Sequence, residues 1–154
     1  MTCPAIAAKP IMNETNSIAI FANAWFWGPQ LRFSKLNGVA KVIVGYSGGS
    51  KPNPTYRNIM DSTESVWIEF DPDVIAFEDL VVEWARMHSP TRKTSTQYRS
   101  VLFYADEEQK MLAEDAVRAL KQQRGVIYVD IEPMTTFYKA EEYHQNYLSK
   151  KGMK

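Results

Sequence analysis

Hydrophobic positions along the chain follow two spacings, one typical of strands and one typical of helices. Short apolar runs, or apolar residues at every second position, predict five strands, at residues 18–22, 39–46, 65–70, 101–104 and 126–131. Apolar residues at intervals of three and four predict three helices, at residues 29–36, 77–88 and 107–124. Strands and helices therefore alternate through most of the chain.

Several predicted helix ends carry residues with known end preferences. Pro29 suits the first turn of a helix, because the proline ring fixes a helical φ and the missing N–H has no partner there. The pair Asn37 and Gly38 suits a helix end, where a left-handed residue is common. Asp106, followed three positions later by Gln109, indicates the capped start of the helix at residues 107–124.

The third predicted strand, residues 65–70, is amphipathic. Val66 and Ile68 point to one face, and Trp67 and Glu69 point to the other. This alternation predicts a strand with one solvated face.

The order of elements indicates the fold class. Helices and strands are interleaved, and a short final segment, residues 140–151, can form a helix or a loop. We predict an α+β fold: a mixed β-sheet with a split β-α-β (ferredoxin-like) core covered by helices. Residues 1–16 lack periodicity and are expected to form an irregular N-terminal arm, with one folded domain at residues 17–150.

Composition narrows the function classes. The 154 residues include 45% hydrophobic positions and one cysteine, Cys3, so a Cys-rich metal site and an internal disulfide are excluded. His88 and His144 lie far apart in the sequence, and neither has other candidate metal ligands nearby. We therefore expect both to be hydrogen-bonded structural residues, and we expect no metal and no cofactor. Any thiol mechanism must use Cys3.

The distribution of charge and the length of the apolar runs indicate the protein's partners and its cellular compartment. Residues 1–60 carry six basic residues and one acidic residue, whereas residues 61–142 carry nine and seventeen. No basic stripe with interleaved aromatic residues is present, so we expect no nucleic acid partner. No apolar run reaches the length of a membrane helix, and the N-terminus lacks a secretory pattern. We expect a cytoplasmic protein, or one in an organelle lumen if a leader was removed.

A series of motifs resembles one known family. The segment that runs from Ile20 to Gly28, Ile-Phe-Ala-Asn-Ala-Trp-Phe-Trp-Gly, resembles the nucleophile segment of the A-type peptide methionine sulfoxide reductases, an apolar strand followed by Gly-Cys-Phe-Trp-Gly. Further collinear matches are Gly38-Val39, Gly45-Tyr-Ser-Gly-Gly49, Asn53-Pro-Thr-Tyr56, Glu64, Phe70-Asp-Pro72, His88-Ser-Pro-Thr91, Thr96-Gln-Tyr-Arg-Ser100, Glu107-Glu-Gln109 and Ala140-Glu-Glu-Tyr-His-Gln145. The resemblance covers residues 18–148.

The resemblance implies a peptide-methionine (S)-S-oxide reductase site. Phe26 and Trp27 would bind the substrate methyl group, and Glu64, Tyr46 and Tyr98 would polarise and protonate the sulfoxide oxygen. In the family a cysteine thiolate attacks the sulfur and becomes a sulfenic acid. An aromatic wall for a methyl group and three O–H or carboxyl groups for one oxygen form a coherent set.

The chain departs from the family in the residues that carry the chemistry. Trp25 stands at the nucleophile position and Ala24 at the preceding glycine, and an indole cannot replace a thiolate. The family's His-Ala-Glu becomes Ser-Thr-Glu at residues 62–64. Lys93 aligns with the site aspartate, and the loops before Glu64 and around Lys93 are shorter than usual. The strand and helix patterns remain intact.

These departures predict a pseudoenzyme, a folded family member that lacks reductase activity and is retained as a binding or structural protein. Three alternatives stay open: a selenocysteine codon misread as Trp25, a relocated nucleophile at Cys3, and an altered enzyme that uses Glu64, Tyr46 and Tyr98 for other acid/base chemistry. A TGG codon for residue 25 in the native gene would remove the first alternative.

The resemblance also leaves structural roles open for the same side chains. Phe26 and Trp27 can serve as core aromatics, and Tyr46 and Tyr98 can serve as buried hydrogen-bonding groups. A Glu64–Lys93 ion pair would lower the pKa of the Glu64 carboxyl and make it a structural group. We further expect a protein partner or larger assembly that contacts the N-terminal arm and the lysine-rich C-terminal end, and binding of a methionine sulfoxide side chain only if the pocket is open.

Overall fold

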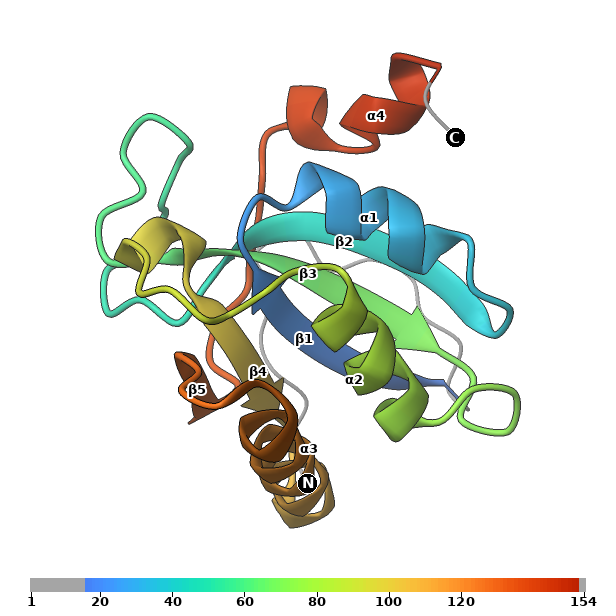
Figure 1. The fold of residues 1–154 in the computed structure, drawn as a ribbon. Coiled ribbons are helices and arrows are strands. Elements are labelled where there is room, and N and C mark those ends of the chain that lie inside the picture. The colour runs from blue at the N-terminus through green and yellow to red at the C-terminus, as the bar shows by residue number, and fades with distance from the viewer. Residues whose placement is uncertain (1–15, 153–154) are drawn as a thin grey trace.

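The computed structural model describes residues 16–152, and a single six-stranded sheet forms its centre (Figure 1). The strands are β1 (Ser17–Asn23), β2 (Val39–Ser47), β3 (Thr63–Phe70), β4 (Ser100–Tyr104), β5 (Val129–Pro133) and β6 (Tyr138–Lys139). The helices are α1 (Trp27–Ser34), α2 (Phe77–Arg86), α3 (Glu107–Arg124) and α4 (Tyr147–Lys150), with 3₁₀ turns η1 (Thr96–Tyr98) and η2 (Glu142–His144).

Sheet topology confirms the predicted fold class. The strand order is β5-β4-β1-β3-β2-β6, in which β3 pairs antiparallel with both β1 and β2. Strands β1 and β2 are therefore parallel with β3 between them, and α1 connects them as a split β-α-β unit. The unit β3-α2-β4 repeats this arrangement around β1. Two interleaved split units are the ferredoxin-like core, and α3 adds β5 parallel to β4.

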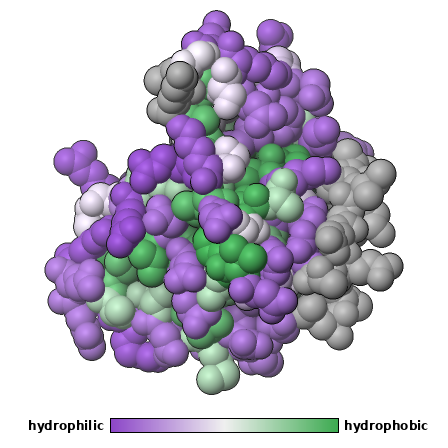
Figure 2. All heavy atoms as spheres, turned by 90° about the vertical axis from the view of Figure 1, so that its right-hand side faces the viewer, coloured by the Kyte–Doolittle hydropathy of each residue, from purple (hydrophilic) through white to green (hydrophobic). Residues whose placement is uncertain are grey.

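Helices α1, α2 and α3 lie on one face of the sheet (Figure 1). Every second strand residue faces them, and Phe33 of α1, Trp84 of α2 and Val117 of α3 pack into the same apolar cluster as Phe21 and Ile68. In Figure 2, which shows one side of the molecule, hydrophobic side chains form patches among hydrophilic ones. Burial of one apolar stripe per helix is the main stabilisation of this layer.

The prediction that β3 has one solvated face is wrong. Trp67 and Glu69 are both buried, 2% and 4% exposed. A second apolar cluster covers this face, in which Trp67 packs with Ile43 of β2, Phe103 of β4 and the loop residue Phe137. An alternating pattern predicts which residues share a face, but the cover comes from segments distant in sequence, so the prediction of solvent contact failed.

Most predicted element ends agree with the structure. The Asp106 carboxylate accepts a hydrogen bond from the Gln109 N–H at 2.9 Å and caps α3, and Gly125 ends that helix at φ 79°. The last predicted strand starts later than expected, at Val129, because the Tyr128 N–H donates to the Pro90 carbonyl oxygen and pairing with β4 begins at Val129. The final segment contains both alternatives, a 3₁₀ turn and a short helix.

Residues 1–15, which include Cys3 and nearly all of the predicted arm, lie outside the described residues. Within residues 16–152, no helix is long and apolar enough to cross a membrane.

Candidate functional site

The turn between β1 and α1 carries the residues at the family's nucleophile motif. Ala24 has a left-handed φ of 70°, and this sharp turn directs Phe26 into the core, where it is 1% exposed. Trp25 at the turn is 49% exposed. A nucleophile at position 25 would therefore stand at the solvent boundary of the site, and the side chain there is an indole.

Trp27 contacts two other aromatic rings. Its ring centroid is 3.6 Å from that of Tyr147, with the planes 15° apart, and 4.4 Å from that of Trp25. The Tyr147 ring is stacked on the Trp27 indole, whereas the Trp25 ring is tilted by 35° against it. Trp25 and Tyr147 therefore both pack against Trp27.

The orientation of Trp27 is also fixed at its edge. Its indole N–H donates a hydrogen bond to Nδ1 of His144 at 3.0 Å. His144 is 1% exposed and lies against the rings of Phe26 and Tyr56. Burial lowers its pKa, although the nearby Glu141 carboxylate acts in the opposite direction. A neutral imidazole can accept the indole hydrogen bond, so this pKa direction favours the observed contact.

Glu64 is fully buried on β3. Its Oε1 accepts the backbone N–H of Phe26 at 3.4 Å, and its Oε2 accepts the side-chain amide of Gln97 at 2.6 Å. Burial raises the pKa of the Glu64 carboxyl, and the two hydrogen bonds oppose this shift without cancelling it. The site therefore contains a carboxylic acid that keeps its proton more readily than an ordinary glutamate.

The hypothetical Glu64–Lys93 ion pair is wrong. Within residues 16–152, Glu64 forms no salt bridge, and Lys93 lines a separate hollow of about 400 Å³ with Arg99 and Tyr128. The pKa of Glu64 accordingly moves up and not down. Sequence alignment placed Lys93 at the site aspartate, but the shortened loop carries its side chain to another surface.

Tyr46 and Tyr98 reach the site from different elements. Tyr46 pairs with Glu64 in the β2–β3 ladder, and its hydroxyl donates to Glu141 at 2.7 Å. Burial, and then the Glu141 carboxylate, raise the pKa of Tyr46. The hydroxyl of Tyr98 accepts from Gln97 at 3.1 Å, and burial is the largest of the causes that raise its pKa to about 12. Both phenols are neutral at physiological pH.

Four contributors to this site were not predicted from the sequence as site residues: Gln97, Glu141, His144 and Tyr147. The first three lie in segments that matched the family, so these motifs could have identified them as site residues. His144 was expected only as a structural hydrogen-bonded residue, which its bond to Trp27 supports. Its buried Nε2 has no hydrogen-bond partner among the described residues.

The other histidine, His88, has the predicted structural role. Its Nδ1 lies 2.9 Å from the Trp84 carbonyl oxygen and its Nε2 lies 2.7 Å from the Ser100 hydroxyl. Burial lowers its pKa to about 4. In the part of the chain that the structure describes, no group of three or more acidic, histidine or cysteine side chains could hold a metal ion.

The assembled site thus has a buried carboxyl group and aromatic walls, and its described residues include no thiol. Phe26, Trp27, Glu64, Tyr46 and Tyr98 converge as the resemblance implied, whereas Lys93 does not join them. Such a site can bind and protonate an oxygen atom, but the tryptophan at position 25 cannot attack sulfur.

Comparison with known proteins agrees with this geometry. Residues 17–154 match the family described as peptide methionine sulfoxide reductase. The chain is 40% identical to peptide methionine sulfoxide reductase MsrA of Acidobacterium capsulatum over 148 residues, covering 88% of this chain and 95% of that protein. It is 42% identical to peptide methionine sulfoxide reductase of Fragaria ananassa, covering 91% and 80%.

Solved structures of relatives share the fold. The crystal structure of reduced Mxr1 from Saccharomyces cerevisiae superposes with a TM-score of 0.87 at 27% identity, covering 99% of this chain and 94% of that one. Methionine sulfoxide reductase A of Corynebacterium diphtheriae superposes with a TM-score of 0.85 at 30% identity, covering 91% and 77%. The chain belongs to the peptide methionine sulfoxide reductase family.

Proposed function

We propose that this family member does not reduce methionine sulfoxide and is retained as a binding or structural protein. The observation that carries the proposal is Trp25 at the position of the nucleophile. The family reaction needs a thiolate there: the sulfur of that residue takes the sulfoxide oxygen, becomes a sulfenic acid and releases the thioether. An indole has no lone pair of comparable nucleophilicity on an accessible atom.

The contacts of Trp27 support the proposal independently. In the family reading, the face of this indole receives the substrate methyl group. Here the indole is stacked on Tyr147 and also packs against the Trp25 ring, whose centroid lies 4.4 Å away. The substituted side chain therefore removes the nucleophile and also occupies space against the wall that would bind the methyl group.

The remaining acid supports a specific cause for the loss. Glu64 is buried, bonded to the Phe26 N–H and biased toward its protonated form, as a donor to a sulfoxide oxygen must be. We therefore assign the loss of activity to position 25. Trp25→Cys should restore reduction, because it supplies the thiol and removes the ring that packs against Trp27 in a single change.

The test uses four proteins: wild type, Trp25→Cys, the double variant Trp25→Cys with Glu64→Gln, and Trp25→Ser. Each is mixed with the S epimer of a dabsyl-methionine sulfoxide and dithiothreitol, and dabsyl-methionine is measured by chromatography. We expect turnover by Trp25→Cys at least tenfold above wild type and Trp25→Ser, and a loss of at least tenfold on adding Glu64→Gln, the usual scale for an acid catalyst.

Wild-type turnover that is specific for the S epimer would contradict the proposal. Inactivity of Trp25→Cys, with its fold verified by circular dichroism, would instead assign the loss to the shortened loops and overturn position 25 as the cause.

A further inference from the structure

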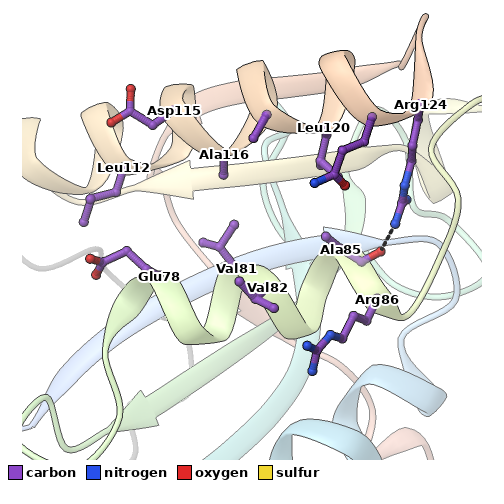
Figure 3. A pocket seen from close by; sticks show the side chains of 12 residues that line it. Glu78, Val81, Val82, Ala85, Arg86, Leu112, Asp115, Ala116, Leu120 and Arg124 are labelled. Atoms are coloured by element: carbon purple, nitrogen blue, oxygen red, sulfur yellow. Dashed lines mark hydrogen bonds between the residues drawn. The ribbon is translucent and has the colours of Figure 1, made fainter.

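A groove of about 570 Å³ runs between α2 and α3, away from the residues of the candidate site (Figure 3). The two helices run side by side, and their facing side chains form an apolar floor: Val81, Val82 and Ala85 from α2, and Leu112, Ala116 and Leu120 from α3. Val82 is 47% exposed although it is aliphatic. The groove thus exposes apolar surface without any contribution to the methionine sulfoxide chemistry.

Charged side chains divide the groove into two ends. Glu78 and Asp115 lie at one end, and Arg86 and Arg124 lie at the other (Figure 3). Eight residues separate Glu78 from Arg86 along α2, which is about 12 Å at the rise of an α-helix. The groove therefore has an acidic end and a basic end separated by about two helical turns of apolar floor.

Part of this charge is not neutralised within the chain. Among residues 16–152, Glu78 forms no ion pair, and the Arg124 guanidinium donates only to the neutral carbonyl oxygens of His88 and Ala85. Asp115 and Arg86 form ion pairs on their own helices, with Arg118 and Glu83. Glu78 at the acidic end and Arg124 at the basic end therefore each keep an uncompensated charge.

The shape of the groove selects a convex occupant. A single helix presents a ridge of side chains at intervals of three and four residues, and such a ridge fits between two parallel helices at ordinary packing distances. A second copy of the same concave surface would leave its centre unfilled. Interdigitation of an apolar ridge with the α2–α3 floor would bury Val82 and the side chains around it.

We propose that the α2–α3 groove binds an amphipathic helix of a partner protein, with acidic residues in the first turn of that helix and basic residues in its last turn. The acidic turn contacts Arg86 and Arg124, and the basic turn contacts Glu78 and Asp115. The bound helix then runs antiparallel to α2 and α3. Its charges also agree with the usual preference of helix ends for acidic first turns and basic last turns. The proposal is independent of whether position 25 supports catalysis.

The test uses two synthetic fourteen-residue peptides with blocked ends and a fluorescent label. Both place leucine at helical intervals; one has glutamates in the first turn and lysines in the last, and the other exchanges these charges. Affinity for the full chain is measured by fluorescence anisotropy. We expect the first peptide to bind at least tenfold more tightly, and Val82→Glu to weaken its binding at least tenfold. The matched control Val126→Glu, at a more exposed valine outside the groove, should leave binding unchanged.

A charge-reversed protein separates groove electrostatics from peptide helicity. In Glu78→Lys with Arg124→Glu, which reverses the two uncompensated charges, the preference between the two peptides should invert. The proposal is overturned if neither peptide binds at millimolar concentration, if the preference stays the same in the charge-reversed protein, or if Val126→Glu weakens binding as much as Val82→Glu. A dimer in sedimentation equilibrium that Val82→Glu dissociates would also overturn it, since the occupant would then be a second copy.

Discussion

Ala24 holds a backbone conformation that glycine adopts at lower cost. Its φ of 70° lies in the left-handed region, which costs an alanine about 1 kcal/mol or more. Ala24→Gly should therefore raise the free energy of unfolding by up to about 1 kcal/mol, after the larger chain entropy of glycine is subtracted. Urea denaturation measures this change. Ala22→Gly, in the buried β1 strand, is the matched control and should lower the free energy of unfolding. If both variants lower it to the same extent, residue 24 is not strained.

Glu64 makes the stability of the protein depend on pH in a defined direction. Its folded-state pKa is raised by burial above the ordinary value of 4.5, so between these two values the folded state binds more protons than the unfolded state. Stability from this group therefore falls as pH rises through that window. Glu64→Gln should raise the unfolding free energy by about 1 kcal/mol at pH 7, because the buried charge is removed and Gln97 can rotate its amide to accept a hydrogen bond.

The advantage of Glu64→Gln should shrink as pH falls and should be lost below 4.5, where the wild-type carboxyl is protonated in both states. Chemical denaturation at several pH values measures the difference, with Glu78→Gln as an exposed control. A variant that is less stable than wild type at pH 7, or a difference that grows on acidification, would contradict the raised pKa of Glu64.

At this scale the sequence predicted which side chains meet but not how they are paired. Phe26, Trp27, Glu64, Tyr46 and Tyr98 were identified by their motifs, and they do converge. The partners of Glu64 and the displacement of Lys93 depend on loop paths, which single residues do not encode. The cover of Trp27 by Trp25 and Tyr147 likewise required coordinates.

Strand β6 fixes the C-terminal segment to the sheet. A Cβ at Gly45 would lie 2.3 Å from the Tyr138 carbonyl oxygen, and Gly45 pairs with Lys139 in the β2–β6 ladder. Gly45→Ala should therefore break this pairing and release the segment that carries Glu141 and His144. We expect a loss of about 1–3 kcal/mol in unfolding free energy, the range typical of overpacking.

Hydrogen exchange measures the release more directly than global stability. Backbone amides of residues 138–147 should lose protection in Gly45→Ala while those of α3 retain it, and tryptophan fluorescence should change because Trp27 loses its hydrogen bond to His144. Gly28→Ala, where an added Cβ meets nothing within 4 Å, is the matched control. Unchanged protection at 138–147 would show that β6 does not hold the segment.

Element prediction succeeded where one short pattern determines one element. The Asp106 cap, the end at Gly125 and the apolar stripe of α2 all depend on local chemistry, and the structure contains each of them. Strand β6, with two residues, has no detectable period, and the burial of Trp67 depends on Phe137, seventy positions later. Two-residue strand pairing and burial by residues distant in sequence both depend on the tertiary structure, so a local sequence pattern does not predict them.

At the scale of the whole molecule, the proposed loss of activity leaves the fold unchanged. The interleaved β-α-β units and both apolar clusters are intact, and the mixed sheet agrees with the fold class predicted from the order of elements. The departures from the family lie at the turn after β1 and in two loops. Because the core sets stability while the loops carry the chemistry, a chain of this kind can lose one and keep the other.

The central claim is that the chain has no reductase activity of its own. The most direct measurement is the conversion of the S epimer of a methionine sulfoxide by wild-type protein at stoichiometric concentration with dithiothreitol, followed by chiral chromatography. We predict no methionine above that formed by dithiothreitol alone, and no difference between wild type and Cys3→Ala. Methionine formed from the S epimer alone, at a rate that Glu64→Gln abolishes, would show a working reductase and contradict the claim.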